Sequence, residues 1–240
     1  MKNRKFGGKN AVCKSKFNKF ALGAVLVSSI ISSACANGLF IGADGEYNFN
    51  SKYNFKYKLI ENGININTLS DNYKDSSFGI GLKFGYDFDL WRIYTKFNAV
   101  LGAKDKQQFY AATETQEYKW DTYNLIVGGD WTPKFNLAGL DFKGILGAFA
   151  GVSNIVLEDN FQHPSGFNNL KTNYGGFIYG AKIGGIYEID QNNEIEFGFK
   201  IDQTNFDQNQ ENTATIGIIR QETKHKITNM GVFVGYNYKF

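Results

Sequence analysis

Charged side chains recur at every second position of stretches that are otherwise apolar, and they are the residues best placed for chemistry. Asp44 and Glu46, for example, alternate with Ala43, Gly45 and Tyr47. Alternate positions of a strand share one face, so these charges would gather on one side of a sheet. The full set is Asp44, Glu46, Lys83, Arg92, Lys96, Asp130, Lys143, Lys182, Glu196, Lys200 and Asp202. Such a cluster could conduct ions or form a network of ion pairs.

His163 and Ser165 form a second candidate, because a serine needs an oriented base to act as a nucleophile. The pair resembles the one in lipid A-deacylating barrels, where it lies on a strand. Here it falls in a predicted connection with Pro164 between, and the nearest acids upstream are Glu158 and Asp159. No strand would hold that geometry, so we predict no catalytic residue. His225 is predicted to be a polar residue near the rim of the last strand.

The apolar stretches predict eight strands, because their hydrophobic residues recur with a period of two. The predicted ranges are 39–50, 76–88, 92–103, 118–131, 140–153, 174–189, 194–206 and 223–240. Their apolar faces carry no charged residue, while the charges occupy the opposite parity. A soluble sheet protein would put its apolar face inside. Lipid around a closed barrel with a polar interior explains the reverse, and closure pairs every backbone amide.

The predicted strands bring the charges together in two groups. Asp44 and Glu46 would lie beside Lys83 on the next strand, and Glu196, Lys200 and Asp202 would lie beside Lys182. Eight strands leave an interior just wide enough for side chains. The size therefore favours a charge-plugged barrel over an open ion path. Inward-facing glycines such as Gly81 and Gly180 would make room for longer neighbours.

The connections alternate between long and short, as in outer-membrane barrels. Long ones are predicted near 51–75, 104–117, 154–173 and 207–222, and short ones near 89–91, 132–139 and 190–193. The long connections would face outward and the short turns and both termini would face the periplasm. The first long connection holds Tyr53, Phe55, Tyr57 and Tyr73, which could contact host or neighbouring surface molecules.

Aromatic residues cluster near the predicted periplasmic ends of the strands, where rings suit the lipid headgroup layer. They are Phe88, Trp91, Trp131, Phe142, Tyr187 and Phe197.

Residues 1–36 are predicted to be a cleaved secretory signal and residues 37–240 the barrel domain. A basic segment precedes the apolar run Ala21–Ala34, and the small residues of Ala34-Cys35-Ala36 favour cleavage after Ala36. The 14-residue run is short for a spanning helix, which needs about 20. Two alternatives stay open: an uncleaved anchor, and lipidation of Cys35, although Ser32 stands where lipoprotein signals usually have leucine.

The charge balance differs between the two segments. Residues 1–36 hold seven cations and no acid, leaving 19 cations against 23 acids, a formal charge of −4, in the rest of the chain. This balance argues against a nucleic-acid surface. Both cysteines, Cys13 and Cys35, fall in the signal, so no disulfide, cysteine metal site or cofactor is predicted for the barrel.

The last strand, with Val232, Val234, Tyr236, Tyr238 and terminal Phe240, resembles the assembly signal of bacterial outer-membrane proteins. With the signal and eight strands, the chain resembles the OmpA-type and opacity-protein-like family of small surface barrels. That resemblance implies a place in the outer membrane of a Gram-negative bacterium. It also implies contact with membrane lipid and lipopolysaccharide, and assembly by the barrel-assembly machinery.

We therefore expect a non-enzymatic, charge-plugged barrel that acts as a structural or adhesin-like surface protein through its outward connections. A small ion-conducting porin is the alternative, and a lipid A-modifying enzyme is the least favoured hypothesis.

Overall fold

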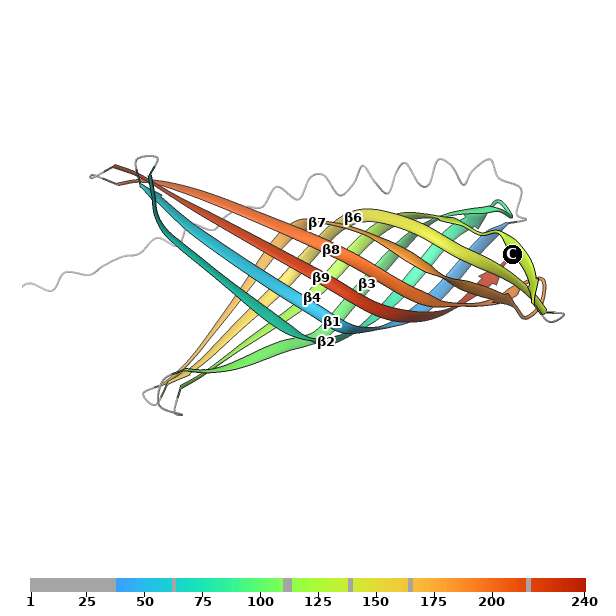
Figure 1. Ribbon diagram of the computed structural model, residues 1–240, viewed down its shortest axis with the longest axis horizontal. Coiled ribbons are helices and arrows are strands. Elements are labelled where there is room, and N and C mark those ends of the chain that lie inside the picture. The colour runs from blue at the N-terminus through green and yellow to red at the C-terminus, as the bar shows by residue number, and fades with distance from the viewer. Residues whose placement is uncertain (1–37, 62–63, 110–113, 138–139, 164–165, 215–216) are drawn as a thin grey trace, which may run out of the picture. The chain divides into compact units, whose positions relative to one another are not determined.

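The computed structural model describes residues 38–61, 64–109, 114–137, 140–163, 166–214 and 217–240, and these form nine antiparallel strands (Figure 1). The predicted signal, residues 1–36, lies outside the described residues. The strands are β1 (Leu39–Glu61), β2 (Ile64–Asp87), β3 (Trp91–Phe109), β4 (Glu114–Trp131), β5 (Lys134–Leu137), β6 (Leu140–His163), β7 (Gly166–Glu188), β8 (Asn193–Ala214) and β9 (Gly217–Lys239).

Eight long strands close into a barrel, as predicted. The order β4-β3-β2-β1-β9-β8-β7-β6 is completed by a pairing of β4 with β6. The short β5 lies within the predicted connection 132–139 and continues the β4 ladder along β6, because Trp131 pairs with Leu146 and Lys134 with Lys143. Pro133 interrupts the strand here, since it has no amide hydrogen to donate.

The four long connections predicted from the sequence are wrong, because the strands continue through most of them. At the ends joined by short turns, the predicted and observed limits agree closely; β1 begins at residue 39 in both. At the other end β1 runs to Glu61 instead of residue 50, and β2 begins at Ile64 instead of residue 76. Polar and charged residues are frequent in these extensions, so they were predicted as connections, although Tyr53, Phe55 and Tyr57 alternate with polar residues in the first of them.

The extended strands separate into two four-stranded sheets (Figure 1). The β2–β3 ladder stops at Phe78 and Leu101, and the β7–β8 ladder stops at Phe177 and Asn205. Beyond these points one sheet consists of β2, β1, β9 and β8, and the other of β3, β4, β6 and β7.

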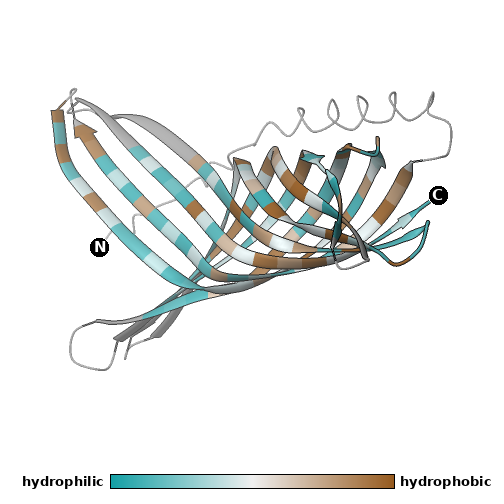
Figure 2. Cartoon of the chain, turned by 45° about the vertical axis from the view of Figure 1, so that its right-hand side comes forward, coloured by the Kyte–Doolittle hydropathy of each residue, from teal (hydrophilic) through white to brown (hydrophobic). Residues whose placement is uncertain are grey.

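The distribution of apolar residues divides the strands into two parts (Figure 2). In the spanning part, large apolar side chains point outward; Phe78, Ile80 and Leu82 are 65–68% exposed. This surface suits lipid, as the sequence predicted. The spanning part comprises residues 39–49, 77–87, 91–101, 122–131, 142–153, 177–188, 193–203 and 229–239, and the outer part comprises the strand residues beyond it. The described residues contain no helix long and apolar enough to cross a membrane, a finding that concerns helices alone.

Two β-bulges mark the boundary between these parts. The register of β1 shifts between Asn48 and Ser51, and that of β3 shifts between Val100 and Ala103, where Gly102 has a φ of +87°. A bulge inserts one residue, so it exchanges the two faces of the strand. Even-numbered residues face inward on β1 up to Asn48, and odd-numbered residues such as Tyr53 face inward beyond it.

Candidate functional site

The interior of the spanning part is the candidate site, and it holds all eleven charged residues singled out from the sequence. The inward parity of every strand places them there, within reach of one another across the lumen. Nine of them are buried as whole residues, and the side chains of Lys96 and Lys200 are 13% and 7% exposed. The charges form three layers along the barrel.

The layer nearest the short turns is organised by Arg92. Its Nη2 lies 2.8 Å from Asp87 Oδ2 and 2.5 Å from Glu194 Oε2, and the whole residue is 1% exposed. Lys143 contacts Asp87 at 3.3 Å and Glu188 at 3.0 Å. Lys239 closes the layer by pairing with Glu188 and with Glu194 at 2.6 Å. Glu188, Glu194 and Lys239 were missed in the sequence, although Glu194 shares the parity of Glu196.

The middle layer contains two ion pairs around one ring. Lys83 pairs with Glu196, and Lys182 Nζ lies 2.8 Å from Asp130 Oδ2. Both ammonium groups face the Tyr94 ring, with Lys182 Nζ at 4.5 Å and Lys83 Nζ at 5.5 Å from its centroid. A cation over an aromatic face adds electrostatic attraction in a desolvated site.

The third layer links three strands, β1, β3 and β8. Lys96 Nζ contacts Asp44 at 2.7 Å and Glu46 at 2.6 Å, while Lys200 pairs with Glu46 and with Asp202 at 3.0 Å. Each lysine therefore lies between two carboxylates.

The pairings differ from those predicted between neighbouring strands. Lys83 contacts Glu196 on β8 rather than Asp44 or Glu46, because its direct cross-strand neighbours are Gly42 and Lys96. Long side chains instead cross the lumen, over glycines that leave room. A Cβ at Gly81 would lie 2.4 Å from Lys96 Cε, and one at Gly147 would lie 2.1 Å from Asp130 Oδ1.

Little space remains among these side chains. The cavity bordered by Glu46, Lys83, Tyr94 and Glu196 measures about 30 Å³. One water needs roughly 10–15 Å³ on this scale, so this cavity has room for only a few waters.

Amides and hydroxyls cover the charged layers at the outer limit of the spanning part. Asn48 donates to Ser77 at 3.0 Å, and Asn124 donates to Asn98 at 3.0 Å. Asn229 donates to Asp202 at 2.8 Å, which connects this level to the charges below.

An aromatic cluster fills the barrel beyond the amides and joins the two outer sheets. The rings of Tyr53 and Trp120 lie 5.7 Å apart, those of Tyr73 and Tyr118 4.5 Å, and those of Tyr174 and His225 4.7 Å. The buried members of the cluster are Tyr53, Tyr73, Ala103, Trp120, Ile155, Leu157, Phe206 and Ile227.

Two predictions are corrected by this cluster. Tyr53 and Tyr73, expected in an exposed connection, are 3% and 4% exposed, because the bulge in β1 turns Tyr53 inward. His225, expected at a polar rim, is also buried, and its Nδ1 is hydrogen-bonded to the Tyr53 hydroxyl at 2.6 Å. Burial raises the pKa of the Tyr53 phenol above its ordinary value.

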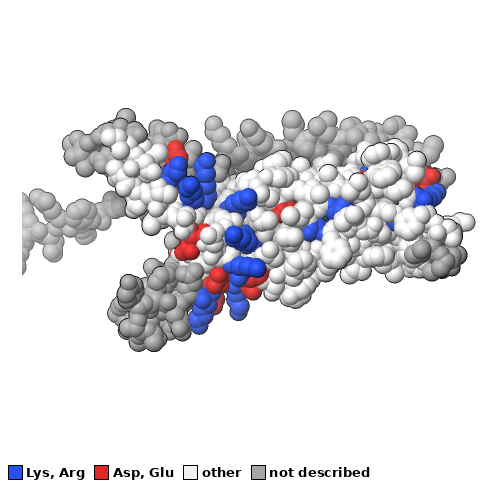
Figure 3. Space-filling view, viewed as in Figure 1, with Lys and Arg blue, Asp and Glu red and all other residues white. Residues whose placement is uncertain are grey.

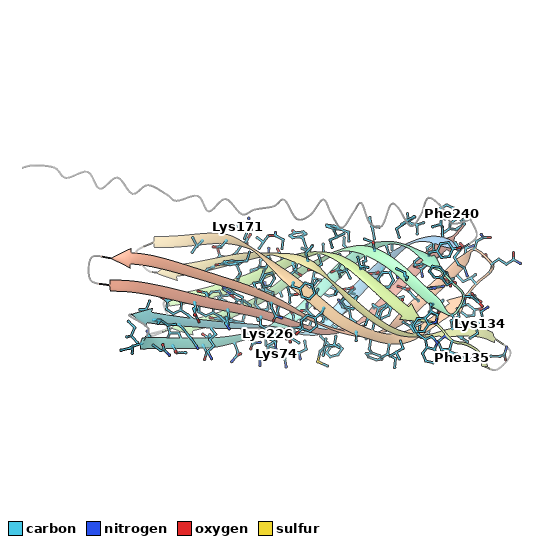
Figure 4. All side chains as sticks on the ribbon, turned by 90° about the horizontal axis from the view of Figure 1, so that it is seen from above. Lys74, Lys134, Phe135, Lys171, Lys226 and Phe240 are labelled. Carbon is cyan, nitrogen blue, oxygen red and sulfur yellow. The ribbon has the colours of Figure 1, made fainter. Side chains whose placement is uncertain are left out.

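The predicted interface aromatics lie on the outside of the barrel at the end with the short turns. Trp91 pairs directly with Trp131 across β3 and β4, and the rings of Phe142 and Tyr187 lie 5.3 Å apart. Phe88 and Phe197 are exposed. Tyr236, Tyr238 and Phe240 also point outward, and Figure 4 shows Phe240 at this end.

Catalytic or metal-binding chemistry has little support in the described side chains. They include no group of three or more histidine, cysteine, aspartate or glutamate residues that could hold a metal ion. The side chains of His163 and Ser165 lie outside the described residues.

Comparison with known proteins gives matches only among solved structures. No family model and no curated protein matches the chain. The crystal structure of Neisserial surface protein A matches with 13% identity and a TM-score of 0.45, covering 86% of this chain and 100% of that one. The outer membrane protease OmpT of Escherichia coli matches with 11% identity, a TM-score of 0.46 and coverage of 84% and 97%. The outer membrane protein OprG of Pseudomonas aeruginosa matches with 15% identity, a TM-score of 0.43 and coverage of 85% and 97%. The solved structures that this chain is similar to are thus bacterial surface and outer-membrane proteins.

Proposed function

We propose that this protein is an outer-membrane barrel with a closed interior, which acts at the cell surface through its outer part. The observation that carries the proposal is the filling of the lumen from one end to the other. Three layers of paired charges, one level of amides and an aromatic cluster follow one another inside the same eight strands.

The ion pairs support a structural role for the charges. Moving a lone charge from water into a protein interior costs several kcal/mol, so a buried charge must be paired to be stable. Conduction would require these pairs to separate and water to replace them. The aromatic cluster is a second obstruction, because its rings are packed against each other across both sheets.

The porin alternative has less support for the same reason. Barrels that hold an aqueous channel have about 16 or more strands, and in eight-stranded ones side chains fill the interior. The charged side chains that could have conducted ions are paired with one another, which supports the closed interior.

The outer part supports the surface role. Its strands carry alternating polar residues on the outside, and the two sheets are held together at their base by Tyr73 with Tyr118 and by Tyr174 with His225. The short turns and both described strand ends lie at the opposite end, where Phe240 N–H donates to Leu39 O at 2.9 Å. We place the outer part away from the cell. The end with the short turns and these two strand ends then faces the periplasm.

Single-channel recording tests the closed interior. Folded protein, verified by its changed mobility on a detergent gel before and after boiling, is inserted into a planar bilayer. We expect no steady conductance over the membrane potentials that the bilayer withstands. Reproducible conductance steps that change in Lys83→Met or Glu196→Gln would overturn the proposal, because ions would then pass the middle layer.

A binding measurement tests the surface role separately. Cells that display the protein are compared with cells that display a shortened variant. In this variant the outer parts of β1 and β2 (51–61 and 64–75), with the two residues between them, are replaced by a two-residue turn. We expect the wild type alone to increase attachment to host cells or to other bacteria. Equal attachment by both would contradict an adhesin-like role while leaving the closed interior in place.

A further inference from the structure

A row of exposed lysines lies on one wall of the barrel, just beyond the outward apolar residues of four adjacent strands. On β3, β2, β1 and β9 the first outward charged residues after the apolar surface are Lys104, Lys74, Lys52 and Lys226. They follow Leu101, Phe78, Phe49 and Met230, each an exposed apolar residue of the spanning part. Figure 3 shows lysine and arginine side chains gathered at the level where the uncharged barrel surface ends.

Cations in and just beyond this row stand directly across from one another on neighbouring strands. Lys52 stands directly across from Lys74, and one step further out Lys56 stands directly across from Lys224. Like charges in direct cross-strand positions destabilise a sheet. Among the described residues, no carboxylate forms an ion pair with any of the lysines in the row. The nearby Asp75 and Asp105 instead accept the backbone N–H groups of Lys104 at 3.0 Å and Lys74 at 3.2 Å.

The opposite wall is different at the same level. There, on β6 and β7, Lys171 lies 2.7 Å from Glu158. Lys119 on β4, which stands directly across from Lys104, is also paired, with Asp121 at 3.4 Å. The hydrogen bond from Lys171 lowers the pKa of the Glu158 carboxyl. Figure 4 shows Lys171 on one side of the barrel and Lys74 and Lys226 on the other. Among the described residues, the exposed lysines of this level that form no ion pair are therefore those on β3, β2, β1 and β9.

An apolar groove runs over the spanning part of the same wall. Small residues form its floor, namely Ala43 and Gly45 on β1 and Ala99 on β3. Larger residues border it, including Leu82 and Val234. A Cβ placed at Gly45 would meet no atom within 4 Å, so the hollow is open to the outside.

The spacing between the row and the groove fits a lipid molecule. Ile80, which borders the groove, lies six positions along the strand from Lys74. At about 3.3 Å per residue and a tilt of about 40°, this is roughly 15 Å along the membrane normal, half the hydrocarbon thickness. Acyl chains attached to a headgroup at the lysine row would thus reach the groove.

We propose that this wall binds a phosphorylated glycolipid of the outer leaflet, with its phosphates on Lys52, Lys74, Lys104 and Lys226 and an acyl chain in the groove. The phosphates would relieve the repulsion between the lysines, and the groove would accept methylene groups without displacing protein atoms. The inference rests on the proposed orientation in the outer membrane.

Titration of the full, detergent-solubilised protein with bisphosphorylated lipid A tests the site. The headgroup variant is Lys52→Gln/Lys74→Gln/Lys104→Gln/Lys226→Gln, and its control is Lys171→Gln on the opposite wall. The groove variant is Gly45→Leu, and its control is Ala150→Leu, which lies outward on β6. Lipid A without phosphates and a soluble polyanion, inositol hexakisphosphate, are the comparison ligands.

We expect affinity for lipid A to fall about fivefold for each lysine removed, a loss that grows at low salt. Gly45→Leu should also weaken binding, while both controls match the wild type. Dephosphorylated lipid A should bind wild type as weakly as lipid A binds the headgroup variant. Unchanged affinity in the headgroup variant would overturn the inference.

Equal affinity for inositol hexakisphosphate and lipid A, with no effect of Gly45→Leu, would also overturn it, because the ligand would then come from solution. The conductance experiment separates this inference from the proposed function. Lipid binding that is insensitive to both variants, in a barrel that does not conduct, would remove the lipid site alone. Lysine-dependent lipid binding by a conducting barrel would remove the closed interior alone.

Discussion

The spanning and outer parts of the barrel are filled by opposite kinds of side chain. In the spanning part the interior holds buried charges such as Arg92 and Glu196, and the outside is apolar. In the outer part the interior holds buried rings and aliphatic residues such as Trp120 and Ile227, and the outside is mainly polar, with a few exposed apolar residues such as Leu69. The solvent around each part accounts for the difference, because lipid surrounds the first and water surrounds the second.

The two parts also differ in how they obtain stability. The outer part resembles the core of an ordinary soluble protein, where burial of apolar area stabilises the fold roughly in proportion to that area. In the spanning part the outward apolar residues remain in contact with lipid, so they are not buried in the protein and their burial does not stabilise the fold. Its interior is stable only while every charge is paired, so it should be sensitive to the loss of a single partner.

Glu196→Gln should therefore have the largest effect. The glutamate pairs with Lys83 and accepts a hydrogen bond from Asn237 Nδ2 at 3.2 Å. Removing its charge leaves the Lys83 ammonium buried without its partner, which costs about 3–5 kcal/mol. Urea unfolding of the protein in lipid vesicles would measure this loss in the free energy of unfolding.

The double variant Lys83→Met/Glu196→Gln provides the control, since it removes both charges. We expect it to recover most of the loss, because replacing a buried pair by apolar groups is often nearly neutral. A single variant that costs less than about 1 kcal/mol would show that the other carboxylates or water reach Lys83. The interior would then be less dry than the geometry indicates.

Ile227→Ala should have a smaller effect that stays local. Ile227 is fully buried in the aromatic cluster, and truncation of a buried isoleucine costs about 2–5 kcal/mol. We expect the low end of that range, because the backbone ladders between the two sheets stop at Phe78 and Phe177, which lets the sheets relax toward the cavity. Hydrogen exchange should accelerate in 51–60 and 222–228 and stay unchanged in 39–48.

Thr228→Ala, which lies outward on the same strand, should leave exchange in both segments as in the wild type. If Ile227→Ala accelerated exchange in 39–48 equally, the two parts would unfold as one unit, and the distinction between them would concern composition alone.

The period-two alternation was sufficient to predict the spanning part. Lipid on one side and charge on the other impose a strict alternation, so the strand number, the turn positions and the inward parity of Asp44 and Lys182 followed from the residues. The partners of each charge did not follow. Lys83 and Glu196 lie on strands separated by β1 and β9, and only the closed geometry brings them together.

The inward face of the outer part could not be predicted from the alternation, because each bulge exchanges the two faces of the strand without a change in the sequence pattern. Tyr47, Phe49, Tyr53 and Phe55 all have odd numbers, so the sequence shows no sign that the first two face lipid and the last two face inward. One extra residue near Asn50 produces that exchange. Gly102 was a usable signal in β3, since glycine in a strand often marks a bulge.

Raising the pH should produce the smallest effect and should act on the outer part. Because burial raises the pKa of Tyr53, its phenol releases its proton in the unfolded chain, near pH 10, before it does so in the folded barrel. The stability that the neutral phenol contributes is therefore complete below pH 10 and declines as the pH rises above it. At pH 11 the loss should be about 1.4 kcal/mol relative to pH 9.

Tyr53→Phe isolates this contribution from the other groups that titrate near pH 10. The variant should lose about 1 kcal/mol at neutral pH, because the hydrogen bond to His225 is removed. Between pH 9 and 11, however, its free energy of unfolding should fall less than that of the wild type by about 1.4 kcal/mol. Parallel pH profiles for the two proteins would mean that water reaches the Tyr53 hydroxyl, and that the rings of the outer part cover the lumen without sealing it.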